Sequence, residues 1–168
     1  MDKNLISYSM SGADIIKELN GKCNLVKYSD IRHFKTLEEL LGKYKKCIIL
    51  YETKQNYGHW TCIYEHNGTV YFFDSYGVIP NGQLKFIPTE LNKALEQDHK
   101  HLIKLLLDSN KPVEYNEYRL QELKENVNTC GKWVTFRLKY PFVSVEDFGN
   151  LFKNKGGDFL INQLVKIN

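Results

Sequence analysis

Two segments rich in hydrophobic residues flank Asn67 and Gly68. The flanking segments, residues 58–66 and 69–77, are rich in aromatic and β-branched side chains. An Asn-Gly pair between two such segments is the strongest local signal for a two-residue type I′ turn. The pattern therefore predicts a tight β-hairpin centred on this pair.

The register of this hairpin brings two titratable side chains together. Counting outward from the turn, Thr61 faces Asp74 and His59 faces Tyr76. Because side chains alternate along a strand, all four point to one face. His59 and Asp74 are then diagonal cross-strand neighbours, with backbones roughly 7–8 Å apart. One hydrogen bond between the imidazole and the carboxylate can span that gap.

Both faces of the hairpin carry large apolar side chains, so we expect it in the middle of a sheet with helices on both faces. Residues 47–51 are a continuous apolar run of β-forming residues, which predicts a second strand buried on both faces. Residues 111–115 contain a proline and are predicted to form an edge strand. The expected fold class is α+β, with a central mixed or antiparallel sheet.

Helices are predicted from capping signals and from apolar residues at helical spacing. Ser11 with Asp14, and Thr36 with Glu39, have the spacing of a capping box, in which side chains bind the first N–H groups of a helix. The residues after Cys130 are ambiguous, since their apolar positions fit either a helix or a strand; Thr129, just before them, is a candidate N-cap. The predicted helices cover residues 11–21, 36–42, 89–107, 144–152 and 158–165.

The composition is typical of a globular domain. The chain has 168 residues, of which 42% are hydrophobic and 26% charged, so we expect one domain over residues 1–168 with its own core. The net charge of +3 is too small to indicate nucleic-acid binding. The sequence lacks the apolar runs of a signal peptide or a membrane span. We expect a monomer that is intracellular, not secreted, and has no membrane partner.

Four cysteines, Cys23, Cys47, Cys62 and Cys130, are scattered along the chain without a CxxC pair. That spacing fits neither a zinc site nor a disulfide framework, so we expect free thiols in a reducing compartment, no metal and no cofactor. Cys62 points to the opposite face of the hairpin from His59, which excludes it as a partner of that imidazole.

His59, Asp74 and Cys130 together have the groups that a cysteine nucleophile needs. An imidazole can take the thiol proton, and a carboxylate on the far ring nitrogen orients the ring and stabilises the imidazolium. If Cys130 begins a helix, the free N–H groups there favour the thiolate and can bind the oxyanion of an acyl-transfer intermediate. Gly131 lets a substrate carbonyl approach the backbone. Taken alone, each residue also fits a structural role, such as a turn for the aspartate or core packing for the cysteine.

The sequence resembles the cysteine peptidases of the adenovirus-type and ubiquitin-like-protein-specific (SUMO protease) clan. The resemblance covers residues 48–138 and is closest to compact members in large DNA viruses and virophages. The matching motifs, in chain order, are His59-Trp60, Asp74-Ser75-Tyr76-Gly77, and Cys130-Gly131-Lys132-Trp133 preceded by Gln121.

This resemblance implies a papain-like, adenain-like α+β fold in which Cys130 begins a buried helix and belongs to a Cys-His-Asp triad. It also implies a glutamine that completes the oxyanion hole, for which Gln121 is the candidate. Gln121 lies farther from Cys130 than is usual in the clan, so Asn126 and Asn128 stay open as alternatives. Trp60 is implied to help form a narrow substrate cleft, and packing in the core is the alternative.

The implied function is that of a thiol protease. The leading prediction is an endopeptidase that cleaves peptide bonds next to glycine and matures viral capsid or structural precursor proteins, in the host cytoplasm, the viral factory or the virion. The alternatives are an isopeptidase that removes ubiquitin-like modifiers and a catalytically silent binding module. Some viral relatives use DNA, but the lysines here lie only in short runs, so nucleic acid is left open as a partner and not predicted.

Overall fold

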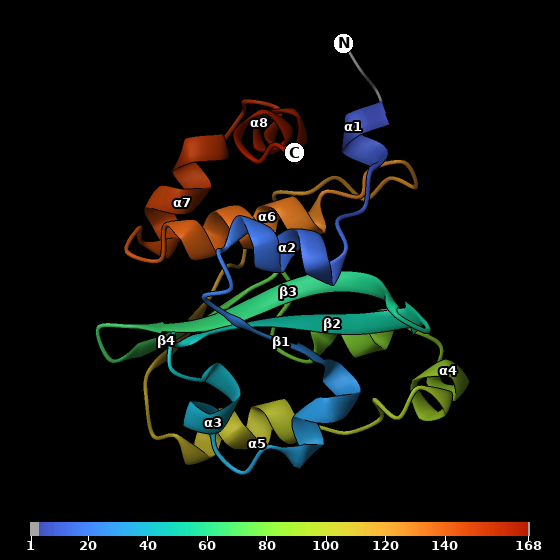
Figure 1. Ribbon diagram of the computed structural model, residues 1–168, viewed down its shortest axis with the longest axis vertical. Coiled ribbons are helices and arrows are strands. Elements are labelled where there is room, and N and C mark those ends of the chain that lie inside the picture. Colours follow the sequence, from blue (N-terminus) through green and yellow to red (C-terminus); the bar gives the residue numbers. More distant parts are fainter. Residues whose placement is uncertain (1–3, 168) are drawn as a thin grey trace.

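The centre of the protein is a mixed five-stranded sheet in the order β1-β2-β3-β4-β5 (Figure 1). The computed structural model describes residues 4–167. The pairs β2–β3 and β3–β4 are antiparallel, whereas the edge pairs β1–β2 and β4–β5 are parallel. The strands span Asn24–Lys27 (β1), Lys46–Lys54 (β2), Tyr57–His66 (β3), Thr69–Phe73 (β4) and Val113–Tyr115 (β5). The predicted α+β class and the predicted edge strand are confirmed.

The β3–β4 hairpin has the predicted register. Tyr64 pairs with Tyr71, as the count from the turn requires. Asn67 and Gly68 have φ values of 50° and 80°, and a type I′ turn needs positive φ at both of these positions. The local turn signal therefore predicted the correct register for residues 62–66 and 69–73.

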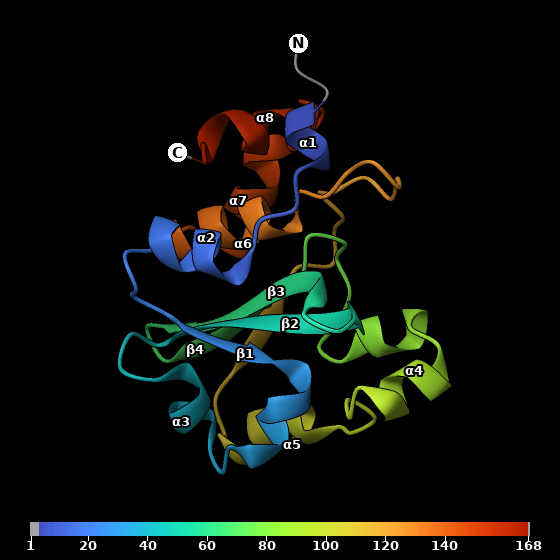
Figure 2. The ribbon, with the colours of Figure 1, turned by 45° about the vertical axis from the view of Figure 1, so that its right-hand side comes forward.

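Helices cover both faces of this sheet (Figures 1 and 2). Helices α1, α2, α6, α7 and α8 lie on one side, and α3 and α5 lie on the other with the 3-10 helix η1. The helices span Asn4–Ser7 (α1), Gly12–Glu18 (α2), Tyr28–His33 (η1), Leu37–Leu41 (α3), Gly82–Phe86 (η2), Thr89–Ala94 (α4), His101–Asp108 (α5), Cys130–Lys139 (α6), Val145–Phe152 (α7) and Gly157–Leu164 (α8). Within residues 4–167, each helix is too short or too polar to cross a lipid bilayer.

Each face of the sheet has its own hydrophobic core. On the side of α6, Trp60 from β3 packs in a cluster with Trp133. On the opposite side, Ile63 from the same strand packs in a cluster with Leu105 of α5. Because the central strands are buried on both faces, consecutive positions along them are apolar, as in residues 47–51.

The single helix predicted over residues 89–107 is wrong, because the chain forms two helices there, α4 and α5. Glu96 between them has a φ of 58°, a left-handed conformation that a helix interior does not allow. The break lets the buried side chain of Gln97 accept the N–H of Glu52 at 3.1 Å and donate to its carbonyl at 2.7 Å. These two bonds satisfy the polar backbone near the end of β2.

Helix α6 begins at Cys130, as the resemblance implies, and it is buried along most of its length. It lies between the sheet and helices α7 and α8 (Figure 1). A helix with neighbours on several sides does not need a single apolar stripe. This explains why the periodicity after Cys130 does not distinguish a helix from a strand.

Candidate active site

His59 and Asp74 form a hydrogen-bonded pair at the end of the hairpin that lies away from its turn. His59 Nε2 lies 2.8 Å from Asp74 Oδ1. The Asp74 side chain is fully buried, whereas 11% of the His59 side chain is exposed. The proximity predicted from the hairpin register is therefore present.

Several groups fix the Asp74 carboxylate in place. Its Oδ1 also accepts the backbone N–H of Tyr76 at 2.8 Å, and its Oδ2 accepts Nε2 of Gln83 at 2.7 Å. Asn116 binds the backbone of Asp74, donating to the carbonyl at 2.6 Å and accepting the N–H at 3.2 Å. Both carboxylate oxygens thus have partners, which a buried charge requires. The sequence analysis missed Gln83 and Asn116, and no local motif marks either of them.

Cys130 lies against the other side of the imidazole. Its thiol is close enough to the His59 ring to raise the pKa of that imidazole, through hydrogen bonding and charge. Because Nε2 of that ring is bound to Asp74, Nδ1 is the ring nitrogen left for an interaction with the thiol. The other three cysteines are buried free thiols, and burial raises the pKa of each of them. The structure therefore brings His59, Asp74 and Cys130 together.

The pKa of His59 is raised to about 10. Burial of the ring is the largest single influence and lowers the pKa. The charge and hydrogen bond of Asp74, together with the contact to Cys130, act in the opposite direction and outweigh it. The imidazolium is thus the favoured form at neutral pH, so the ring places a positive charge beside the sulfur of Cys130.

Asp158, at the start of α8, anchors the start of α6. Its Oδ1 accepts the hydroxyl of Thr129 at 2.6 Å and Nε1 of Trp133 at 3.1 Å, and its Oδ2 accepts the N–H of Glu122 at 2.9 Å. Thr129 occupies the predicted N-cap position, but its hydroxyl binds Asp158 instead of a helix N–H. Asp158 therefore fixes the residues on both sides of Cys130, and the sequence analysis missed it.

Replacement of Asp158 by alanine is expected to lower the free energy of unfolding by roughly 2–4 kcal/mol, because three donors lose their acceptor in a largely buried site. Urea denaturation followed by circular dichroism measures this change. Asp98→Ala, at an exposed position between α4 and α5, is the control. Equal losses in the two variants would contradict an anchoring role for Asp158.

Gln121 is buried and lies beside the His59–Asp74 pair. Its Oε1 accepts the hydroxyl of Ser75 at 2.7 Å. Its Nε2 donates to the carbonyl of Val127 at 3.0 Å and to the hydroxyl of Tyr76 at 3.1 Å. The Tyr76 ring stacks on the His59 ring, with ring centroids 4.6 Å apart. Gln121 thus reaches the site through the hydroxyl of Tyr76.

The two asparagines left open as alternatives to Gln121 have different surroundings. Asn126 is exposed. Asn128 donates from its backbone to the carbonyl of Ile6 and from its side chain to the carbonyl of Ser7, which ties it to α1. Of the three amides, Gln121 is the one bound to the residue that stacks on the imidazole.

Trp60 and Gly131 pack against each other next to the thiol. A side chain at Gly131 would bring its Cβ within 2.8 Å of Met10 Cβ and 3.4 Å of Trp60 Cδ1, so this position has no room for one. Trp60 is 6% exposed and donates from Nε1 to the carbonyl of Met10 at 3.0 Å. The indole also lines a cavity of about 320 Å³ that extends past Gly12 to Tyr57. Trp60 therefore belongs to the core and to the wall of a cavity.

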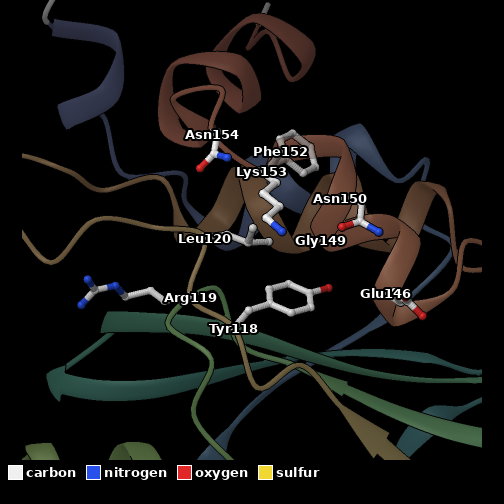
Figure 3. A pocket seen from close by; sticks show the side chains of 10 residues that line it. Tyr118, Arg119, Leu120, Glu146, Gly149, Asn150, Phe152, Lys153 and Asn154 are labelled. Atoms are coloured by element: carbon white, nitrogen blue, oxygen red, sulfur yellow. The ribbon is translucent and has the colours of Figure 1, made fainter.

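A cavity of about 420 Å³ lies between residues 118–120 and helix α7 (Figure 3). Figure 3 shows the ring of Tyr118 below Gly149, with the Arg119 side chain pointing away from it. The lining of this cavity contains neither the imidazole nor the thiol described above. It is therefore not part of the candidate active site.

Comparisons with known proteins bear on the fold and on the family of the chain. No protein-family model matches the chain. The ASFV pS273R protease has a similar fold, with a TM-score of 0.54 and 15% identity over 100% of this chain and 71% of that one. SUMO protease Ulp1, with a TM-score of 0.38 and 14% identity over 88% of this chain and 70% of that one, is too distant to support an argument. The uncharacterized protein V9 of Sputnik virophage is 33% identical over 141 residues, which cover 83% of this chain and 81% of V9. At that identity over most of both chains, the protein belongs to the family of Sputnik virophage protein V9.

Proposed function

We propose that this protein is a cysteine peptidase in which Cys130 is the nucleophile, His59 is the general base and acid, and Asp74 orients His59. The observation that carries the proposal is the continuous contact from the buried carboxylate through the imidazole to the thiol at the start of α6. The fold shared with the ASFV pS273R protease supports it. A histidine whose pKa is strongly shifted by burial and by a specific charged partner is typical of functional sites.

In the proposed reaction, the Cys130 thiolate attacks the carbonyl carbon of a peptide bond, and the carbonyl π electrons move to the oxygen. The His59 imidazolium gives its proton to the leaving amine as the C–N bond breaks, which leaves a thioester on Cys130. Neutral His59 then takes a proton from water while the resulting hydroxide attacks the thioester. The C–S bond breaks, the acid product leaves, and the thiolate–imidazolium pair is restored.

The negative oxygen in this reaction needs hydrogen-bond donors. The N–H of Trp133 donates to the carbonyl of Thr129, so the N–H groups of Cys130 and Gly131 lie in the first turn of α6, where a helix has no backbone acceptors of its own. We propose these two N–H groups as oxyanion donors, with Gln121 supporting the site through its hydrogen bond to the hydroxyl of Tyr76.

The proposed substrate is a protein with glycine next to the scissile bond. Trp60 is 6% exposed and lies beside Gly131, the residue after Cys130. If Trp60 forms the wall of a narrow cleft there, glycine is the residue that fits it. The viral relative supports a viral setting, so we propose maturation of capsid or structural precursor proteins in the host cytoplasm, the viral factory or the virion. We also propose that residues 1–168 act as one domain and as a monomer.

Iodoacetamide at pH 6 is expected to alkylate Cys130 well before the other cysteines. An ordinary thiol, with a pKa of about 8.5, is almost fully protonated at that pH, whereas a thiolate held by the His59 imidazolium reacts. Tryptic mass spectrometry identifies the alkylated residue, and His59→Ala is expected to remove the selectivity. Equal, slow alkylation of all four cysteines would identify a catalytically silent fold.

The substrate class needs a separate experiment. Peptides with glycine at the scissile bond, and ubiquitin-like modifiers that carry a C-terminal electrophile, are offered to the same preparation. Peptide cleavage without modifier adducts supports an endopeptidase. Adducts at Cys130 without peptide cleavage would instead assign the same site to an isopeptidase.

A further inference from the structure

Tyr76 is held in one orientation at the candidate active site. Its backbone N–H donates to Asp74 Oδ1 at 2.8 Å. Its ring lies against the His59 imidazole, with 4.6 Å between ring centroids and 18° between ring planes. Its hydroxyl accepts a hydrogen bond from Gln121 at 3.1 Å. The phenol is therefore fixed by its backbone, its ring and its oxygen.

The hydrogen bonds of Gln121 leave no donor free for a substrate. The Nε2 group has two N–H bonds, one directed at the carbonyl of Val127 and the other at the hydroxyl of Tyr76. A carbonyl can only accept, so the Val127 carbonyl fixes which end of the amide faces it: a flipped amide would place its oxygen against that carbonyl oxygen and lose the bond. The amide is thus fully used within the protein.

The Tyr76 hydroxyl has a proton to give. A phenol can accept and donate at the same time, and Tyr76 accepts from Gln121. Among residues 4–167, no acceptor receives the Tyr76 O–H proton. Burial, followed by the negative charges of Cys130 and Asp74, raises the pKa of Tyr76 to about 12, so the phenol stays protonated when the thiolate forms.

We propose that Tyr76 is a catalytic residue that donates its hydroxyl proton in a hydrogen bond to the oxyanion, and that Gln121 is a positioning residue that holds the phenol oxygen. This assignment rests on the proposed peptidase function and refines its oxyanion site. When the Cys130 thiolate forms the C–S bond, the carbonyl oxygen becomes negative and gains the O–H···O⁻ bond from Tyr76. The proton stays on Tyr76, and the bond is released when the carbonyl re-forms.

The test uses Tyr76→Phe, which keeps the ring on His59 and removes only the hydroxyl. We expect kcat for peptide cleavage to fall by about 10²-fold with little change in KM, as for the loss of one oxyanion donor. Alkylation of Cys130 by iodoacetamide forms no oxyanion, so its rate is expected to stay at the wild-type value. Tyr71→Phe, in the same hairpin but stacked on Tyr64, is the matched control and is expected to cleave normally.

The outcomes separate this inference from the proposed function. Unchanged cleavage by Tyr76→Phe would overturn the role of Tyr76, and an equal fall in alkylation and cleavage would show that the hydroxyl supports the thiolate instead. Absence of both activities in the wild-type protein would overturn the peptidase itself. Gln121→Leu combined with Tyr76→Phe is expected to cleave no more slowly than the slower single variant, because both remove the same donor. Additive losses would show that Gln121 contacts the oxyanion on its own.

Discussion

Replacement of Cys130 by alanine is expected to reduce peptide cleavage by at least about 10³-fold, because the sulfur that forms the acyl bond is gone. The fold should persist, since loss of one small side chain in this position costs roughly 1 kcal/mol. Initial cleavage rates measure the first effect, and the midpoint of thermal unfolding measures the second.

Cys23→Ala is the matched control for this substitution. Cys23 is a free thiol of similar burial, with 8% exposure against 6% for Cys130, and it precedes the edge strand β1. The Cys23→Ala variant is expected to cleave peptide at the wild-type rate. Full activity in Cys130→Ala, or equal inactivation of both variants, would show that the thiol of Cys130 is not the nucleophile.

The sequence predicts those site residues whose positions follow from a local structural signal. Asn67 and Gly68 specify the turn, and strict alternation then sets the faces of β3 and β4. The positions of His59 and Asp74 follow from that register by counting. Cys130 needed the resemblance as well, since the apolar pattern after it fits two kinds of structure.

The groups that support the site come from distant segments without a local signal. Gln83 lies in η2 and Asn116 follows β5, yet both bind Asp74. Asp158 comes from α8 and reaches the start of α6. Each is an ordinary polar residue in sequence, and only the packing of the whole chain gives it a buried partner.

The distance along the chain between Gln121 and Cys130 is explained by the loop between them. This loop folds back on itself, because the Gln121 side chain binds the carbonyl of Val127 and the N–H of Glu122 binds Asp158. The extra residues therefore add length without moving Gln121 away from the imidazole. Sequence spacing alone could not show that the loop folds back. A flexible loop of the same length would also connect Gln121 to Cys130 but would not hold the amide near the imidazole.

Replacement of Asp74 by asparagine is expected to shift the alkaline limb of the pH profile of kcat/KM to lower pH and to reduce its maximum by about 10²- to 10⁴-fold. The direction follows from the His59 pKa, which burial lowers and the charge of Asp74 raises. With the charge removed, burial prevails and the imidazolium loses its proton at lower pH. Cleavage rates between pH 5 and 10 measure the shift.

Asp74→Asn is also expected to change how the free energy of unfolding depends on pH. A folded-state pKa of about 10 for His59, above its ordinary value of 6.5, means that the ion pair stabilises the fold fully below pH 6.5 and loses that contribution as the pH rises to about 10. The difference in unfolding free energy between wild type and Asp74→Asn should therefore narrow over this interval. The asparagine NH2 group also points at a donor, either Gln83 Nε2 or His59 Nε2, because both bind the aspartate oxygens in the wild type. This donor–donor contact lowers the free energy of unfolding at every pH.

Asp147→Asn, at an exposed carboxylate in the first turn of α7, is the control for both measurements. It changes the net charge by the same amount but has no contact with His59, so its alkaline limb should match that of the wild type. If Asp74→Asn and Asp147→Asn gave the same pH profile, Asp74 would have no influence on the protonation of His59. The hydrogen bond between them would then be a structural contact of the hairpin and not part of a catalytic pair.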